Sequence, residues 1–134
     1  MNDTLSWYEE NAESYVSNTK DSLVPDALRE FLSRVREGGR ILDYGCGSGR
    51  DSYFFLKRNY KVDSLDGSER MAEEAARTFG LVVEVAPFLS LNKESVYDGI
   101  WAQASILHLR PRDLEIALDK IFRALKDGGV FYSS

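Results

Sequence analysis

The sequence predicts an α/β protein with three layers built around a mostly parallel sheet. Short apolar segments alternate with segments of helical period from residue 39 onward, and glycine or polar turns separate them. Glycine-rich or acidic residues follow several of the apolar segments. Such alternation favours a parallel sheet covered by helices on both faces. The carboxyl ends of the strands, and any ligand, then share one edge of that sheet.

The first part of the chain has helical periodicity. Residues 5–18 carry apolar side chains at spacings of three and four, opposite an acidic face. Pro25 suits the first turn of a second helix, which is expected to stop at Gly38–Gly39. The apolar stripe of this second helix contains Leu28, Phe31, Leu32 and Val35. We therefore expect one domain over residues 1–134, with an N-terminal helical cap over about 1–38 and a core over about 39–134.

The core is expected to hold five short strands, at residues 41–42, 61–65, 81–85, 97–102 and 130–132. The helices between them are expected at residues 51–57, at about 71–79, and from Pro111 to a Lys-Asp-Gly-Gly stop signal at 126–129. The large aromatic side chains expected in the interior are Phe54, Phe55 and Trp101.

Composition narrows the classes of function. A chain of 134 residues that is 43% hydrophobic and 29% charged fits one folded domain. The formal net charge of -5 disfavours a nucleic-acid partner, which usually needs a basic face. A single cysteine, Cys46, excludes an internal disulfide and a cysteine-based metal cluster, and no metal is expected. No signal peptide or membrane-spanning run is visible, so we expect a cytoplasmic protein without a membrane partner.

The strongest local motif is the loop Asp43-Tyr-Gly-Cys-Gly-Ser-Gly49, between an expected strand and an expected helix. Its glycines let the backbone turn sharply and let a ligand approach closely. A dinucleotide fingerprint would need glycine at position 50, where Arg50 stands, and no Gly-Lys-Ser/Thr follows for a phosphate-binding Walker loop. A glycine-rich turn without a ligand is the remaining alternative.

A second motif is Asp66, 23 residues after Asp43, at the end of the second expected strand. An acidic residue about 20 residues beyond a glycine loop is placed to accept hydrogen bonds from ribose hydroxyls. The alternative is that Asp66 caps the next helix, in competition with Ser68.

On these residues the chain resembles the class I S-adenosylmethionine-dependent methyltransferases. The resemblance rests on four stretches in order: Ile41–Arg50, Ser64–Met71, Tyr97–Ala102 and Leu125–Phe131. The stretch Trp101–Arg110, together with Trp7–Tyr15, resembles the small-molecule branch of tellurite-resistance or ubiquinone-biosynthesis type. The resemblance implies a Rossmann-like domain with S-adenosylmethionine as the cofactor.

The resemblance also implies roles for individual residues. Those around the methionine part of the cofactor would be Asp43, Gly45, Cys46, Gly47 and Gly49. Asp66 would hold the ribose, with Gly67, Ser68 and Met71 beside the adenosine, and Gln103 would approach the sulfonium. The family often places an acidic residue after the third strand, against the adenine. This chain has Phe88-Leu89-Ser90 there, which leaves backbone groups or the Ser90 hydroxyl for that contact.

The implied reaction is direct in-line transfer of a methyl group to a small-molecule acceptor, whose identity the sequence does not name. His108, the single histidine, is either a general base or a side chain packed at the start of a loop. Tyr8 and Tyr15 lie on one face of the first helix, where they either cover the cofactor or pack in the core.

One departure from the family lies at the end of the sequence. Members normally continue past the fifth strand, whereas this sequence ends at Ser134, so we expect a fold truncated after strand five. Val130–Tyr132 would then form an exposed apolar edge, through which two copies could pair as a homodimer. The alternative to an active methyltransferase is an inactive S-adenosylmethionine-binding remnant or interaction module.

Overall fold

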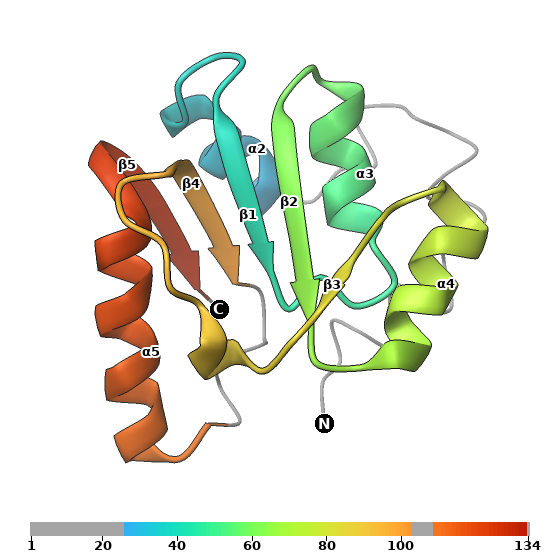
Figure 1. The fold of residues 1–134 in the computed structure, drawn as a ribbon. Helices are drawn as coiled ribbons and strands as arrows, with labels where there is room; N and C mark the ends of the chain where they lie inside the picture. Colours follow the sequence, from blue (N-terminus) through green and yellow to red (C-terminus); the bar gives the residue numbers. More distant parts are fainter. Residues whose placement is uncertain (1–25, 103–108, 134) are drawn as a thin grey trace.

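A computed structural model of the chain describes residues 26–102 and 109–133 (Figure 1). Its α-helices are α2 (Asp26–Arg34), α3 (Arg50–Lys57), α4 (Glu69–Phe79) and α5 (Pro111–Ala124). Its strands are β1 (Arg40–Tyr44), β2 (Lys61–Asp66), β3 (Glu84–Val85), β4 (Tyr97–Ala102) and β5 (Leu125–Ser133). A short 3-10 helix, Phe88–Ser90, lies between β3 and β4.

The five strands form one sheet in the order β3-β2-β1-β4-β5, and every neighbouring pair is parallel. The arrows of β1, β2 and β4 point toward the same edge of the sheet (Figure 1). This arrangement confirms the α/β class and the parallel sheet expected from the alternation of periods.

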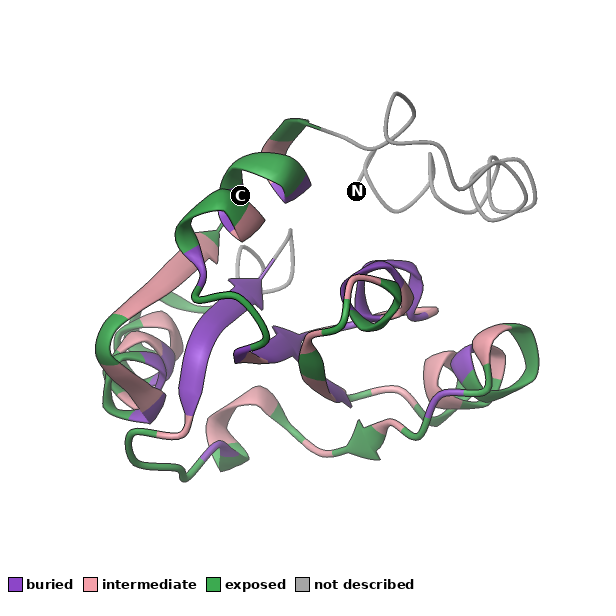
Figure 2. Ribbon diagram, turned by 90° about the horizontal axis from the view of Figure 1, so that it is seen from above, coloured by how far each residue is buried: buried purple, intermediate pink, exposed green. Residues whose placement is uncertain are grey.

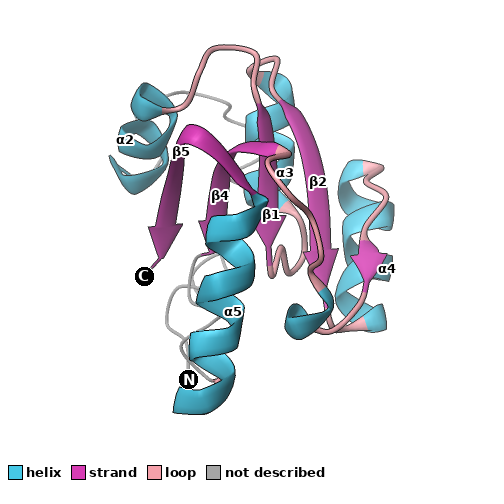
Figure 3. Cartoon of the chain, turned by 60° about the vertical axis from the view of Figure 1, so that its left-hand side comes forward, coloured by secondary structure: helices cyan, strands magenta, loops and turns pink. Residues whose placement is uncertain are grey.

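Helices cover both faces of the sheet, as Figure 3 shows from the side. On one face, α2 and α3 pack on a core cluster of Leu28, Phe31, Val35, Ile41, Phe54, Phe55 and Trp101. On the other face, α5 and the 3-10 helix cover a cluster of Leu42, Tyr44, Leu65, Leu91, Tyr97, Ile100, Ala102, Ile121 and Ala124. The central strands are accordingly buried, whereas β3 is exposed (Figure 2).

The aromatic core expected from the sequence is confirmed. Trp101 is 1% exposed, and its ring lies 5.1 Å from that of Phe31 and 5.9 Å from that of Phe55. Tyr132 of β5 stacks on the indole at 4.2 Å between ring centroids. Such pairs add about 0.5–1.5 kcal/mol beyond burial, so β4 is held firmly between α2, α3 and β5.

The third strand is shorter than predicted. Only Glu84 and Val85 pair with β2, and the prediction of a strand over residues 81–85 is wrong at its start. Leu81 is buried, but Val82 is 93% exposed. The β-branched run suggested an interior strand, whereas the segment lies at the edge of the sheet and has a neighbour on one side only.

The end of α5 also differs from the prediction. The stop signal at residues 126–129 lies inside β5, and the helix ends at Ala124. The backbone N–H groups of Ser95 and Val96 donate to the carbonyl groups of Arg123 and Ala124, at 2.9 and 2.8 Å. Because these bonds satisfy the last carbonyls, the helix ends before the glycines, and the extended chain then pairs with β4 through a register shift.

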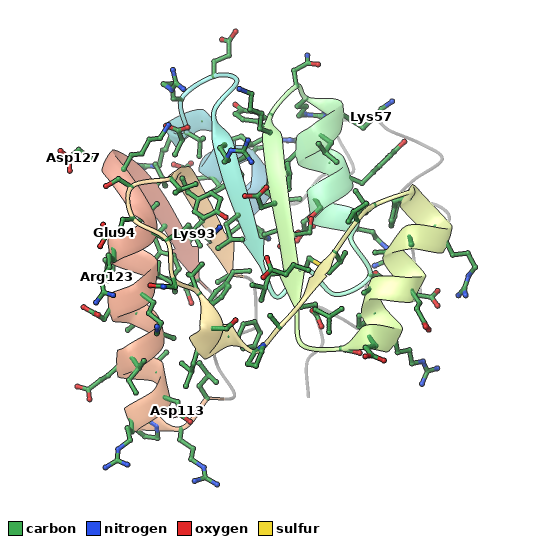
Figure 4. The ribbon with its side chains drawn as sticks, viewed as in Figure 1. Lys57, Lys93, Glu94, Asp113, Arg123 and Asp127 are labelled. Atoms are coloured by element: carbon green, nitrogen blue, oxygen red, sulfur yellow. The ribbon has the colours of Figure 1, made fainter. Side chains whose placement is uncertain are left out.

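Charged side chains of both signs project from the outer surfaces of the helices. Lys57 points outward from the end of α3, and Asp113 and Arg123 point outward from α5 (Figure 4). Arg123 pairs with Asp119 one helical turn away, at 2.6 Å. Among the residues that the structure describes, no helix has the length and apolar character to cross a membrane.

Asp98 anchors the edge of the sheet opposite the glycine loop, and its loss is expected to destabilise the fold. Its carboxylate accepts a hydrogen bond from the Arg40 N–H at 2.9 Å and lies 3.5 Å from both the Arg36 and the Lys126 side chains. Asp98→Ala should lower the free energy of unfolding by about 1–3 kcal/mol, because a partly buried N–H and two cations lose their partner. Urea unfolding at pH 7 measures the loss.

The stabilisation that Asp98 provides should depend on pH, and the comparison of wild type with Asp98→Ala measures this dependence. Burial alone would raise the pKa of Asp98, but the Arg40 hydrogen bond and the charges of Lys126 and Arg36 outweigh it and lower the pKa. The stabilisation is therefore present above the ordinary carboxyl pKa and is lost as pH falls through the lowered one. The difference in free energy of unfolding between wild type and Asp98→Ala should shrink as the pH falls below the ordinary carboxyl pKa, and a constant difference would contradict this. Exposed Asp127→Ala is the control, expected within about 0.5 kcal/mol of wild type.

Candidate functional site

The glycine loop, residues 45–49, connects the end of β1 to the start of α3. The N–H groups of Gly45 and Cys46 both donate to the Leu65 carbonyl, at 2.8 and 2.9 Å, which ties the loop to β2. Gly45, Gly47 and Gly49 have φ values of 85°, 56° and 93°. These left-handed conformations favour glycine, so the three glycines of the motif stand where the backbone of the predicted turn requires them.

Gly49 also lies where α4 packs against the loop. A Cβ atom built on Gly49 would lie 2.4 Å from Cδ1 of Leu81 and 3.1 Å from Cβ of Ala75. The absence of a side chain therefore lets α4 approach the start of α3. The sequence motif predicted the turn, but not this contact between helices.

Asp66 holds the glycine loop and the start of α4 together. One carboxylate oxygen accepts a hydrogen bond from the Gly47 N–H at 2.8 Å, and the other accepts one from the Ser68 N–H at 2.9 Å. Ser68 itself caps α4, because its hydroxyl accepts from the Met71 N–H at 3.2 Å. The helix cap is thus Ser68, and Asp66 reaches back to the loop.

Asp43 lies in a polar row across the sheet. It is level with Ser64 of β2 on one side and with Trp101 of β4 on the other, and it is 2% exposed. The hydroxyl of Ser52, in the first turn of α3, lies 2.7 Å from the Asp43 carboxylate and 2.7 Å from the Ser64 hydroxyl. The carboxyl group is therefore fixed by a helix and a neighbouring strand.

A second carboxyl group, Asp51, lies beside this row. The indole N–H of Trp101 donates to Asp51 at 2.8 Å, and Asp51 is 8% exposed. Sequence reasoning missed Asp51, Ser52 and Ser64. Asp51 and Ser52 follow the glycine loop directly, but acidic and hydroxyl residues at a helix start are ordinary. Ser64 lies on β2, and only its register with β1 places it beside Asp43.

The described part of the site is acidic in character. Burial raises the pKa of Asp43 well above its ordinary value, and the neighbouring charges of Asp51 and Asp66 raise it further. Burial, followed by the charges of Asp43 and Asp66, also raises the pKa of the Cys46 thiol, which stays protonated and unreactive at neutral pH. Such a site favours a ligand with positive charge, because the ligand's charge offsets the repulsion among the carboxylates.

The remaining predicted residues are placed as follows. Gly67 is exposed beside Asp66, and Leu89 is half-buried in the 3-10 helix. Met71 is half-buried and lines a pocket of about 350 Å³ between α4 and the glycine loop, with Ser48 and Arg50, Arg70, Glu74, Thr78 and Phe79. Neither Asp43 nor Asp66 is among the described residues that line this pocket.

Ser90 is described, and some other expected residues fall outside the described residues. The Ser90 hydroxyl donates to the Pro87 carbonyl at 2.6 Å, which leaves its oxygen able to accept a hydrogen bond. Gln103 and His108 lie in the segment after β4 that is not described, and Tyr8 and Tyr15 lie before residue 26.

Fold and site together define a class of protein. It is an α/β protein with a parallel sheet whose glycine loop and acidic side chains meet at the carboxyl edge. The model of the family described as "Methyltransferase domain" matches residues 41–129, from β1 to the glycines of β5. The chain belongs to the class I S-adenosylmethionine-dependent methyltransferases, a family whose cofactor is S-adenosylmethionine.

Individual relatives agree with this family. The chain is 30% identical to a carboxy-S-adenosyl-L-methionine synthase of Nautilia profundicola, over all of this chain and 55% of that protein. A TehB-like methyltransferase of Corynebacterium glutamicum is 26% identical, with a TM-score of 0.71 over 92% of this chain and 68% of that one.

A further solved structure is the 1,6-didemethyltoxoflavin-N1-methyltransferase of Burkholderia thailandensis, with 1,6-didemethyltoxoflavin and S-adenosylhomocysteine bound. It is 26% identical, with a TM-score of 0.67 over 98% of this chain and 58% of that one. The chain spans about half the length of the curated relatives that it matches.

Proposed function

We propose that this chain binds S-adenosylmethionine at the carboxyl edge of its sheet and transfers the methyl group to a small-molecule acceptor. The observation that carries the proposal is the contact between the two predicted motifs. The Asp66 carboxylate, expected to hold the ribose, accepts a hydrogen bond from Gly47 inside the glycine loop. The two groups that would bind different parts of one cofactor are therefore adjacent.

The donors and acceptors of the described residues suit this cofactor. S-adenosylmethionine carries a sulfonium and an ammonium group, and the acidic surroundings of Asp43 favour a cation. Each Asp66 oxygen accepts one protein hydrogen bond and has a second lone pair for a ribose hydroxyl. The residues proposed to surround the methionine part are Asp43, Gly45, Cys46, Gly47 and Gly49, and those proposed beside the adenosine are Gly67, Ser68, Met71 and Leu89.

The bound cofactor supplies a methyl group on a positively charged sulfur, which is a good leaving group. The chain's own contribution would be to hold acceptor and methyl in line, which is worth up to about 7–11 kcal/mol of the barrier. We propose Gln103 beside the sulfonium and His108 as the base for an acceptor that carries a proton. We also propose that residues 1–38 form a helical cap on the core and that Tyr8 and Tyr15 cover the cofactor.

A small-molecule acceptor is supported by two observations. The Burkholderia thailandensis neighbour holds 1,6-didemethyltoxoflavin, and this chain has a net charge of -5. The test is a coupled assay for S-adenosylhomocysteine release, run over amines, phenols, thiols, carboxylates, arsenite and tellurite, with transfer RNA included. Release with a small acceptor supports the proposal. Release with RNA alone contradicts the acceptor class, and binding without release from any acceptor favours a module that binds the cofactor without turnover.

Self-association through β5 is a separate proposal. β5 lies at one edge of the sheet, and Val130, Phe131 and Tyr132 are half-buried there. An edge strand presents unpaired N–H and C=O groups that a second copy can extend. We expect light scattering to show dimers that increase with concentration, and Phe131→Lys should reduce them. A monodisperse monomer at about 1 mM would contradict the proposal.

A further inference from the structure

Two serine hydroxyls form a short hydrogen-bonded chain that ends on Asp43. Ser64 of β2 is level with Asp43 in the sheet, and Ser52 of α3 lies between them, with its Oγ 2.7 Å from each. All three are buried, with Ser52 fully so. Three different elements thus contribute polar atoms to one interior point, directly beneath the glycine loop.

The two serine hydroxyls can make hydrogen bonds with Asp43 whether its carboxyl group is ionised or protonated. When Asp43 is ionised, Ser64 donates to Ser52 and Ser52 donates to the carboxylate. When Asp43 is protonated, its hydroxyl donates to Ser52 and Ser52 donates to Ser64. No heavy atom needs to move between these states. The ionised state gains more, because hydrogen bonds to a charged acceptor are about twice as strong as neutral ones.

The groups that face Asp43 otherwise oppose its ionisation. Asp51 of α3 and Asp66 at the end of β2 both repel a charge on Asp43, and the Cys46 thiol of the loop is neutral. From β4, Trp101 gives its single N–H to Asp51. Ser52 lowers the pKa of Asp43 against burial and this repulsion, through a hydrogen bond from its hydroxyl and a smaller contribution from its backbone.

We infer that Ser52 and Ser64 are positioning residues for cofactor binding, which keep Asp43 ready to ionise when the cationic amino-acid end of the cofactor arrives. The proton leaves the Asp43 carboxyl oxygen for the buffer, and the positive charge of the cofactor then offsets the negative charge of the carboxylate. The inference rests on the proposed function, in which Asp43 lies beside the methionine part of S-adenosylmethionine.

The test is the affinity for S-adenosylmethionine between pH 5.5 and 8.5, measured by calorimetry on the full chain in buffers of different ionisation heat. Wild type should bind more tightly as pH rises and should release protons on binding at low pH. Ser52→Ala should move the pH midpoint upward, so that affinity falls several-fold more at the low-pH end of the range than at pH 8.5. Ser64→Ala should give a smaller shift of the same sign.

Two controls separate this role from a structural one. Ser33→Ala, on α2 and exposed, should follow the wild-type curve at every pH. Asp43→Asn should bind S-adenosylmethionine weakly, and its affinity should not show the pH midpoint of wild type. Equal weakening of Ser52→Ala and Ser64→Ala at all pH values, or no proton release by wild type, would overturn the inference while leaving the proposed function standing. Absence of binding by wild type at every pH would overturn both. If Ser52→Ala does not fold, the Ser64→Ala midpoint decides.

Discussion

Gly49→Ala is expected to lower the free energy of unfolding more than Asp98→Ala. Its backbone is left-handed, with φ at 93°, which costs about 1–2 kcal/mol for a residue with a Cβ. The new methyl would also lie 2.4 Å from the Leu81 side chain, and overpacking of this kind costs about 1–3 kcal/mol. The expected total is about 2–5 kcal/mol, measured by urea unfolding.

Gly38→Ala is the matched control for Gly49→Ala. Gly38 is also left-handed, with φ at 72°, but nothing lies within 4 Å of a Cβ built on it. It should therefore lose only the conformational part, about 1–2 kcal/mol. The excess loss in Gly49→Ala measures the packing of α4 on the loop. Equal losses in both variants would show that Gly49 serves the turn alone.

Asp66→Ala should cause the largest loss of cofactor affinity. The variant removes the proposed acceptor for the ribose hydroxyls and also the acceptor that holds Gly47 and Ser68. Hydrogen bonds to a charged group contribute about 1.5–3 kcal/mol each, so affinity for S-adenosylmethionine should fall at least about 100-fold. Equilibrium dialysis with labelled cofactor measures it over this range.

The ribose contact can be separated from the loop contact with a second ligand. Methionine lacks the ribose, so its weak binding should fall less in Asp66→Ala than that of S-adenosylmethionine. Asp119→Ala, which removes an exposed ion pair on α5, is the control and should leave both affinities unchanged. Unchanged affinity for S-adenosylmethionine in Asp66→Ala would remove this residue from the site.

Local signals in the sequence predicted most of the fold. The strand at Tyr97–Ala102 was predicted with its observed bounds, because a mostly apolar segment that follows a polar loop has few alternatives. The errors occur where contacts with residues distant in the sequence determine the bounds of a strand or helix. Val82 is β-branched, yet it lies at a sheet edge, and α5 ends early because Ser95 and Val96 bind its last carbonyls. Neither fact can be read from the local sequence.

The candidate site was predicted as a set of motifs rather than as contacts. Asp66 was expected from its spacing to the glycine loop, but its hydrogen bond to Gly47 required the fold. Ser52 and Ser64 were missed because nothing local distinguishes a buried polar serine from a helix or strand serine. Their role depends on the register of β1 with β2, which places Ser64 beside Asp43.

We propose that the loop from Asp43 to Gly49, together with Asp66, binds S-adenosylmethionine. Calorimetric titration of the chain with S-adenosylmethionine tests this binding most directly, with a nicotinamide dinucleotide as the comparison ligand. We expect saturable binding of one S-adenosylmethionine per chain and no binding of the dinucleotide, whose fingerprint Arg50 interrupts. No saturable heat with S-adenosylmethionine, or tighter binding of the dinucleotide, would contradict it.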